Sequence, residues 1–270
     1  MQIFFIILLF VIGSSLGSFL CCQARRMHLK TTSKGKSKKL SSRSVCLSCG
    51  YQLRWYDNIP IISWLVLHGK CRKCGKKIGL AEILSELGMG LTFLALGTTI
   101  NIGSASPLTW AVFIFTLFLV LNLGFLAIYD GLYGELPTLC LTISIICAII
   151  VICLKEWLIL SSSSFSSNII LDPIASVAIL GGLYFILYII SKGKWVGDGD
   201  WVLGTALGLA LASPWLALIT LFIANVLACL VMTPVVKKSK NKRIHFGPFM
   251  VIAFVITLTF ADFFYYAIGM

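Results

Sequence analysis

The sequence predicts an all-α polytopic membrane protein of about eight transmembrane helices. Of its 270 residues, 59% are hydrophobic and 12% are charged, and the mean hydropathy is +0.97. Long apolar runs recur along the chain, and each can cross a hydrocarbon core about 30 Å thick. No strand-like alternation is sustained enough to suggest a barrel. Because lipid offers backbone groups no hydrogen bonds, these runs favour a helical bundle.

The first element, residues 1–24, is expected to be a retained transmembrane helix. The apolar run 1–22 lacks a basic start and a clear small-x-small cleavage site, and Arg25-Arg26 follows it as a stop-transfer flank. This is not the pattern of a cleaved signal. Placing the start of the helix outside puts the residues that follow it in the cytoplasm.

The second element, residues 25–77, is a strongly basic loop. It holds fourteen of the 22 Lys and Arg residues and one acid, Asp57, whereas the rest of the chain carries eight bases and nine acids. A basic loop beside an apolar helix sets orientation under the positive-inside rule and attracts anionic lipid. Aromatic residues are not interleaved through its lysine-rich stretch, as stacking on bases would require. The net charge of +12 therefore predicts the lipid bilayer, and not nucleic acid, as the partner.

The basic loop also contains two Cys-x-x-Cys pairs, and a glycine follows each pair. Cys46 and Cys49 form the first pair, Cys71 and Cys74 form the second, and 21 residues separate them. Four thiolates in this pattern predict a structural, tetrahedral Zn²⁺ site, so the loop is expected to be zinc-ribbon-like. A redox role for the pairs is the alternative, but the glycine after each pair favours zinc. The remaining cysteines lie in apolar runs and are expected to be core residues.

Seven further helices are expected. Residues 78–107 would form the second helix and an outer loop, and residues 108–270 a six-helix core. Every basic cluster (25–77, 192–194 and 237–243) then lies on the cytoplasmic side, with Lys155 as the exception. This agreement predicts a multi-pass protein of the cytoplasmic membrane with cytoplasmic basic loops. The expected spans are 78–96, 108–129, 137–157, 173–190, 201–213, 214–238 and 248–268, with a serine-rich outer loop at 161–168.

Two acids, Asp130 and Asp200, fall at the cytoplasmic ends of helices in this arrangement. Ionisable groups at membrane depth are costly and usually mark function. The span 201–213 covers only about 20 Å, so Asp200 is expected to lie below the headgroups. Two carboxylates that meet share a proton, and such a pair can activate water and protonate an amide, as in aspartic proteolysis. Gly197 and Gly199 allow a sharp bend and the close approach of an extended substrate.

Simpler interpretations of these acids remain open at this stage. Asp200 at a helix start is also a good N-cap, and Asp130 before Gly131 suits a turn. Asp198 and Glu135 are further acids at the same level. As a non-catalytic alternative, the chain would be a zinc-ribbon membrane scaffold or assembly factor. An ion transporter is disfavoured, because polar residues do not continue through the spans towards the outer face.

The acids stand in motifs that resemble those of a known family. Gly197-x-Gly199-Asp200 resembles the GxGD motif of intramembrane aspartic proteases, and Asp130 with Leu136-Pro137 is similar to the other motif of type IV prepilin peptidases. The resemblance assigns catalysis to Asp130 and Asp200, with Pro137 and the two glycines in support. Leu132 and Thr138 depart from residues that the family often has there. Two further segments carry the resemblance: the loop 53–64, and residues 245–249 (His-Phe-Gly-Pro-Phe), whose simpler interpretation is a helix breaker.

This resemblance implies a bifunctional bacterial enzyme of the cytoplasmic (inner) membrane. Such an enzyme cuts the basic leader of type IV prepilins or pseudopilins after a glycine at the cytoplasmic face. It then methylates the new N-terminus with S-adenosyl-L-methionine. Glu86 resembles a family residue and is the candidate for the methyltransferase half, although the family's preceding Arg-Tyr-Pro is replaced by residues 81–83, Ala-Glu-Ile. A helix-end acid near lysines is the alternative for Glu86, and no glycine-rich nucleotide loop indicates where the methyl donor binds.

Overall fold

The computed structural model of the chain describes residues 1–32, 45–46, 48–161, 171–193, 196–238 and 245–268. Within these ranges the chain is helical and forms no strand, with two isolated β-bridges in the loop between the first two long helices. It divides into two compact units, Met1–Thr98 and Thr99–Met270. The predicted all-α fold is confirmed.

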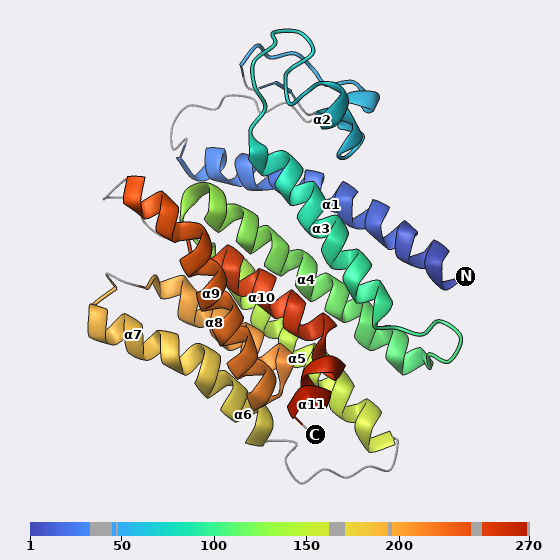
Figure 1. The fold of residues 1–270 in the computed structure, drawn as a ribbon, viewed down its shortest axis with the longest axis vertical. Helices are drawn as coiled ribbons and strands as arrows, with labels where there is room; N and C mark the ends of the chain where they lie inside the picture. The colour runs from blue at the N-terminus through green and yellow to red at the C-terminus, as the bar shows by residue number, and fades with distance from the viewer. Residues whose placement is uncertain (33–44, 47, 162–170, 194–195, 239–244, 269–270) are drawn as a thin grey trace. The chain divides into compact units, whose positions relative to one another are not determined.

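In the first unit, α1 (Gln2–Thr32) packs along α3 (Leu80–Thr98), as Figure 1 shows. A Cβ atom on Gly13 would lie 2.6 Å from the carbonyl oxygen of Met89, and one on Gly17 would collide with the carbonyl of Ser85. The Gly13-x-x-x-Gly17 spacing therefore allows close contact within the chain. Helix α1 continues past the expected apolar span, because residues 23–30 contain no glycine or proline to end it.

Two short helices lie in the loop between α1 and α3: the 3₁₀ helix η1 (Trp55–Asn58) and α2 (Ile62–Val66). Asp57 lies in η1 and is buried. Its carboxylate accepts hydrogen bonds from the backbone N–H of Arg54 at 3.2 Å and from Nε of Arg72 at 2.8 Å. Because Arg72 belongs to the second Cys-x-x-Cys pair, this contact ties η1 to that pair.

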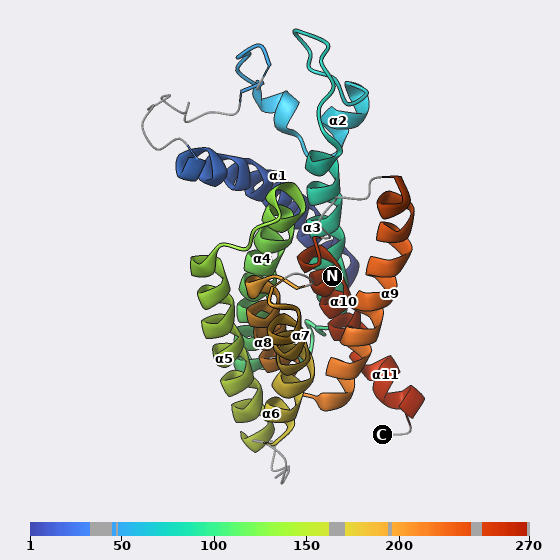
Figure 2. The same ribbon diagram turned by 90° about the vertical axis from the view of Figure 1, so that its left-hand side faces the viewer.

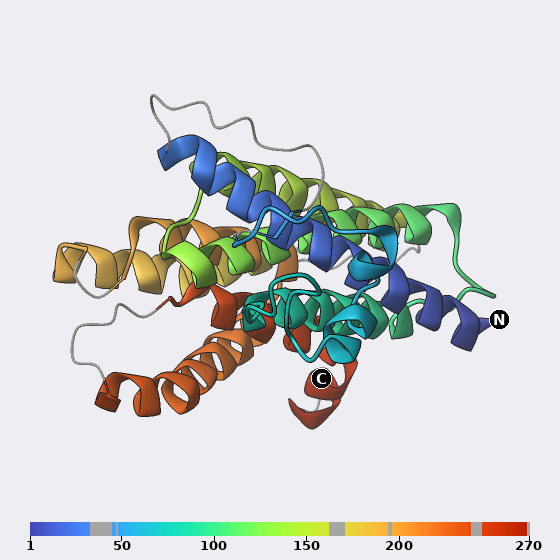
Figure 3. The same ribbon diagram turned by 90° about the horizontal axis from the view of Figure 1, so that it is seen from above.

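The second unit is a helical bundle with α8 (Asp198–Leu211) at its centre (Figure 2). Gly204 and Gly208 allow α8 to pack against residues 176–181, since Cβ atoms there would lie 2.7 Å from Leu180 O and 2.8 Å from Ser176 O. Helices α9 and α10 pack against each other (Figure 3). The other elements are α4 (Pro107–Tyr133), α5 (Thr138–Ser161), α6 (Leu171–Val177), the π-helix η2 (Ala178–Gly182), α7 (Leu183–Ser191), α9 (Pro214–Lys238), α10 (Gly247–Thr259) and α11 (Ala261–Ile268).

The described helices confirm a polytopic membrane protein. Six spans are long and apolar enough to cross a bilayer, and the pair α10 and α11, bent by 72°, makes a seventh if the two helices form one span. The expected number of eight differs because α8, with 14 residues, is only about 21 Å long. It is therefore a short buried helix of the bundle. The expected outer loop at 161–168 and the basic residues Lys194 and 239–243 lie largely or wholly outside the described residues.

Candidate active site and metal centre

Asp130 lies in the last turn of α4 and is 5% exposed. The expected span ended at residue 129, with Asp130 as a possible turn residue before Gly131, but the helix continues to Tyr133. Gly134 then takes a left-handed conformation, with φ of 69°, and its N–H donates to the backbone carbonyl of Asp130 at 2.8 Å. Glycine adopts this conformation without a steric penalty, so it sets the end of α4.

The carboxylate of Asp130 is held by the segment that begins α10. The backbone N–H of Gly247 donates to Oδ2 at 2.9 Å. Nδ1 of His245 lies 3.9 Å from Oδ1. A Cβ atom on Gly247 would stand 2.8 Å from Oδ2, so a larger residue there would displace the carboxylate or the start of the helix. Residues 245–247 thus contact both oxygens of this acid.

Asp200 is the third residue of α8, and its Oδ2 accepts a hydrogen bond from the N–H of Gly197 at 2.9 Å. The sequence analysis held open Asp200 as an N-cap, but the N-cap residue is Gly197, and Asp200 accepts its N–H from the third helical position, as the acid of a capping box does. Among the described residues, this is the one hydrogen bond recorded for the carboxylate. The cap leaves Oδ1 available for chemistry.

The structure brings the two acids towards one another. A Cβ atom on Gly199 would lie 2.7 Å from Cβ of Leu136, so the start of α8 packs directly against the segment that follows Asp130. The charges of Asp130 and Asp198 both act on Asp200. Of the other acids expected at this level, Glu135 and Asp198 are exposed, whereas Asp130 is buried.

The supporting residues take different positions around the pair. The carbonyl of Pro137 accepts hydrogen bonds from the N–H groups of Cys140 and Leu141, and so begins α5. Gly199 is buried against Leu136, so its missing side chain serves helix packing. Gly197 is exposed, and a Cβ there would meet only Asp200 within 4 Å. Gly197 therefore leaves space for the approach of another chain.

Tyr184 of α7 is a neighbour of the acids that the sequence analysis did not identify. It is 3% exposed, its ring lies 5.3 Å from that of Phe246, and the charge of Asp200 acts on it. Nδ2 of Asn225 approaches its hydroxyl at 3.5 Å. Tyr184 lies inside a continuous apolar run, where the pattern shows only a core aromatic residue.

The four predicted zinc ligands converge in the loop of the first unit. The sulfur atoms of Cys46, Cys49, Cys71 and Cys74 all lie within 4.8 Å of one another, with separations of 3.9 Å for Cys46–Cys74 and 4.0 Å for Cys49–Cys71. A tetrahedral site with Zn–S bonds of about 2.3 Å has S–S edges of about 3.8 Å. The four thiols are therefore close enough together to hold a Zn²⁺ ion.

The two Cys-x-x-Cys pairs fold alike. In each, the first cysteine's N–H donates to a residue five positions on, Tyr51 or Lys76, and its carbonyl accepts from the following glycine. Gly50 and Gly75 have φ of 68° and 65°, a conformation that glycine takes freely. Backbone N–H groups of Cys49 and Ser48 lower the pKa of the Cys46 thiol to about 6. That shift favours the thiolate, which is the form that binds metal.

Glu86 lies in the second turn of α3, next to Gly17 of α1, and is 8% exposed. Its Oε2 accepts a hydrogen bond of 2.7 Å from the backbone N–H of Ile61. Ile61 has φ of 63°, which is a strained conformation for a β-branched residue. The structure therefore places Glu86 as a buried anchor for the loop, bonded to a backbone N–H, whereas the alternative considered above was a helix-end acid near lysines.

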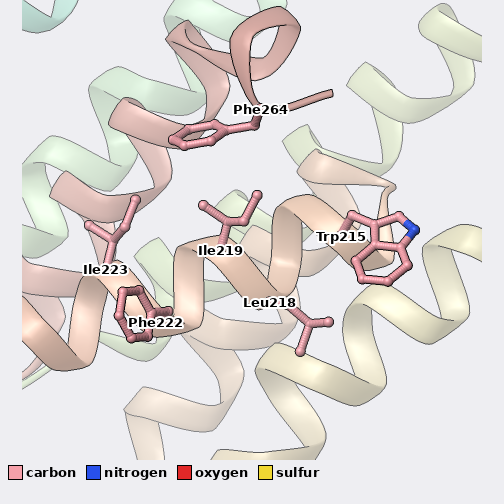
Figure 4. Close-up of a pocket in the computed structure, with 6 residues that line it drawn as sticks. All are labelled: Trp215, Leu218, Ile219, Phe222, Ile223 and Phe264. Atoms are coloured by element: carbon pink, nitrogen blue, oxygen red, sulfur yellow. The ribbon is translucent and has the colours of Figure 1, made fainter. Parts of the chain in front are cut away.

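A wholly apolar groove of about 470 Å³ lies on α9 and α11 (Figure 4). Helix α9 follows the C-terminal end of α8, whereas Asp200 stands near the N-terminal end, about 17 Å away along the helix. The groove is therefore separate from the acid pair. Its lining residues are Trp215, Leu218, Ile219, Phe222, Ile223 and Phe264.

Comparison with known proteins relates both units to one family. The family model "Bacterial Peptidase A24 N-terminal domain" matches residues 11–100. Three relatives carry the name prepilin leader peptidase/N-methyltransferase. The Myxococcus xanthus protein is 42% identical over 91 residues, 34% of this chain and 25% of that protein. The Dichelobacter nodosus protein is 30% identical over 222 residues, covering 80% and 71% of the two chains.

The third relative, from Burkholderia pseudomallei, is 31% identical over 232 residues, or 84% of this chain and 70% of that protein. No solved structure matches the chain. The longer matches reach well beyond residues 11–100 and so include the second unit. The chain belongs to the prepilin leader peptidase/N-methyltransferase family.

Proposed function

We propose that this chain is a membrane-embedded aspartic endopeptidase that cleaves the basic leader of type IV prepilins or pseudopilins after a glycine. One observation carries the proposal: Asp130 at the end of α4 and Asp200 at the start of α8 converge within electrostatic range, each with one carboxylate oxygen held by a backbone N–H. The names of the relatives support the substrate class. Placing the basic loops in the cytoplasm of a bacterial inner membrane puts both acids at the face where the leader lies.

The proposed reaction uses one proton shared by the two carboxyl groups. One acid is ionised and takes a proton from water, while the water oxygen attacks the carbonyl carbon of the leader glycine. The other acid gives its proton to the carbonyl oxygen, which produces a gem-diol. The first acid then protonates the amide nitrogen as the second takes a proton from a diol hydroxyl. The C–N bond breaks, and the pair again holds one proton.

The substrate must reach the acids in an extended conformation. The open space at Gly197 supports this approach, since among the described residues outside its chain neighbours a Cβ atom placed there would meet only the carboxylate of Asp200 within 4 Å. The short helix α8 keeps Asp200 near the end of the bundle, where water and a cytoplasmic leader can both enter.

We further propose that the first unit carries the N-methylation that the relatives' name includes, with S-adenosyl-L-methionine as methyl donor. Glu86 is already bonded to the Ile61 amide. We therefore assign no residues to the methyl donor and derive no step through it. Zn²⁺ held by the four thiolates would supply a structural cross-link, and the contact between Asp57 and Arg72 extends the rigid part of the loop to η1.

The experiment that tests the proposal is cleavage of a prepilin-type substrate by purified protein in liposomes, with the product masses measured. Hydrolysis at the peptide bond after the leader glycine is expected. A folded protein that leaves an inserted substrate intact would instead support the alternative, a zinc-ribbon scaffold in which the acids serve as helix caps.

A further inference from the structure

His245 stands beside the catalytic pair but has no place in the reaction as written above. It precedes α10, and its Nδ1 lies 3.9 Å from Oδ1 of Asp130, the separation of an ion pair. The other oxygen, Oδ2, accepts the N–H of Gly247 at 2.9 Å. The same three-residue segment therefore places an N–H beside one oxygen of this acid and an imidazole nitrogen, which is a donor when protonated, beside the other.

The imidazole occupies a niche that exists because residue 134 is glycine. A Cβ atom on Gly134 would lie 2.6 Å from Cε1 and 2.8 Å from Nδ1 of His245. The ring thus sits directly over the left-handed residue that ends α4, one turn beyond Asp130. Its position is fixed on the other side by Phe246, whose ring packs against the buried Tyr184.

The surroundings of the two acids are unequal. Asp130 faces the imidazole and an N–H of α10. Asp200 faces the N–H of Gly197, and the negative charge of Asp198 acts on it from the same helical turn. Burial opposes negative charge on both acids, but Asp130 has the imidazole and an N–H beside it to offset that cost, whereas Asp200 has one N–H and a neighbouring acid. The charged and titratable groups described around the pair are Asp130 from α4, Asp198 and Asp200 from α8, Tyr184 from α7 and His245 before α10.

We infer that His245 is a positioning residue that holds Asp130 as the ionised acid and leaves the shared proton on Asp200. The inference rests on the proposed function, because it assigns the two roles of that reaction. Asp130 takes the proton from water, and Asp200 gives its proton to the substrate carbonyl oxygen. In the second half, Asp130 protonates the leaving amide nitrogen and Asp200 takes the proton from the diol.

The test compares His245→Leu with His245→Asn by measuring kcat and KM for leader cleavage. Leucine fills the niche but donates no hydrogen bond, so kcat should fall about tenfold or more with KM changed less than about twofold. Asparagine places an N–H donor close to the position of Nδ1, so its kcat should remain within about threefold of wild type. His245→Met repeats the apolar substitution with a flexible side chain in case the leucine variant does not fold.

Wild type and His28→Leu, which removes an imidazole from α1, serve as controls. If leucine and methionine are as active as wild type, or if asparagine loses as much activity as leucine, His245 acts only through packing and the inference is overturned. Absence of cleavage by wild type itself would overturn the proposed function, so the two failures are distinguishable.

Discussion

Single backbone N–H groups orient the carboxylates of three acids in this chain. Gly247 donates to Asp130, Gly197 donates to Asp200, and Ile61 donates to Glu86. A carboxylate bonded to a fixed backbone donor has a defined direction, and such bonds are stronger than those between neutral groups. In each case the donor and the acid come from segments that a bend or helix start brings together.

The bond between Glu86 and Ile61 leads to a prediction at this scale. Glu86→Ala leaves the buried N–H of a strained residue without an acceptor, and this should lower the free energy of unfolding by about 1–3 kcal/mol. Glu86→Gln retains a carbonyl oxygen and should cost less than about 1 kcal/mol. Chemical denaturation of the purified variants provides the measurement.

The rate at which each variant methylates a processed pilin should follow its stability, so Glu86→Gln should be more active than Glu86→Ala. If glutamine is as inactive in methylation as alanine while remaining as stable as wild type, the carboxylate has a chemical role beyond the anchor.

At the scale of elements, the zinc-ribbon-like loop and α8 depend on contacts from outside their own secondary structure. The loop has two matched Cys-x-x-Cys turns and a hydrogen bond that Arg72 donates to Asp57, but little apolar core. Small segments of this kind usually require a metal to remain folded. Helix α8, by contrast, is packed inside an apolar core, since Leu203, Leu207 and Ala210 are at most 1% exposed.

For the loop, Cys46→Ser should lose the bound metal and weaken methylation more than proteolysis, because the acid pair lies in the other unit. Elemental analysis of wild type should find one zinc per chain. Cys153→Ser, an exposed cysteine of α5, is the matched control and should retain the metal. If elemental analysis finds no zinc in the wild-type protein, or as much metal in the Cys46 variant as in wild type, the assignment is contradicted.

For α8, the prediction concerns Lys155, the basic residue that did not fit the charge pattern. Its Nζ donates to the carbonyl of Ala210 at 3.2 Å, and Ser176 Oγ donates to the carbonyl of Gly208 at 2.9 Å. These bonds satisfy carbonyls at the C-terminal end of a helix inside the bundle. Lys155 therefore serves as a helix cap, which explains its place away from the other bases.

Lys155→Met should lower the unfolding free energy by about 1–3 kcal/mol, and Lys155→Arg should restore most of it. Thermal unfolding in detergent measures both. If the methionine variant is as stable as wild type, the cap has no energetic importance.

For the whole molecule, the sequence predicted the helical membrane fold and the clustering of the four cysteines, because both follow from local patterns. Apolar length identifies spans, and paired Cys-x-x-Cys turns need only a short loop to meet. The sequence analysis also recognised that residues 201–213 were too short for an ordinary span. It did not predict that α4 would include Asp130, since the helix end depends on the left-handed Gly134.

The contacts around the acids were less accessible to prediction. Tyr184 and Leu136 reach the site because helices pack against each other, and the spacing of residues in the sequence does not predict which side chains such packing brings together. His245 was part of a recognised segment, but its contact with Asp130 depends on the niche at Gly134. The catalytic roles of Asp130 and Asp200 remain predictions, supported by their convergence and by the family of the chain.

The measurement that tests the central claim most directly is leader cleavage by Asp130→Asn and Asp200→Asn beside wild type, in the same liposomes. Asparagine preserves the size of each side chain and an oxygen that can accept from Gly247 or Gly197, so both variants should remain folded. The account predicts that each variant loses cleavage, because either substitution removes the shared proton system. A folded variant of either kind that processes the substrate at close to the wild-type rate would contradict it.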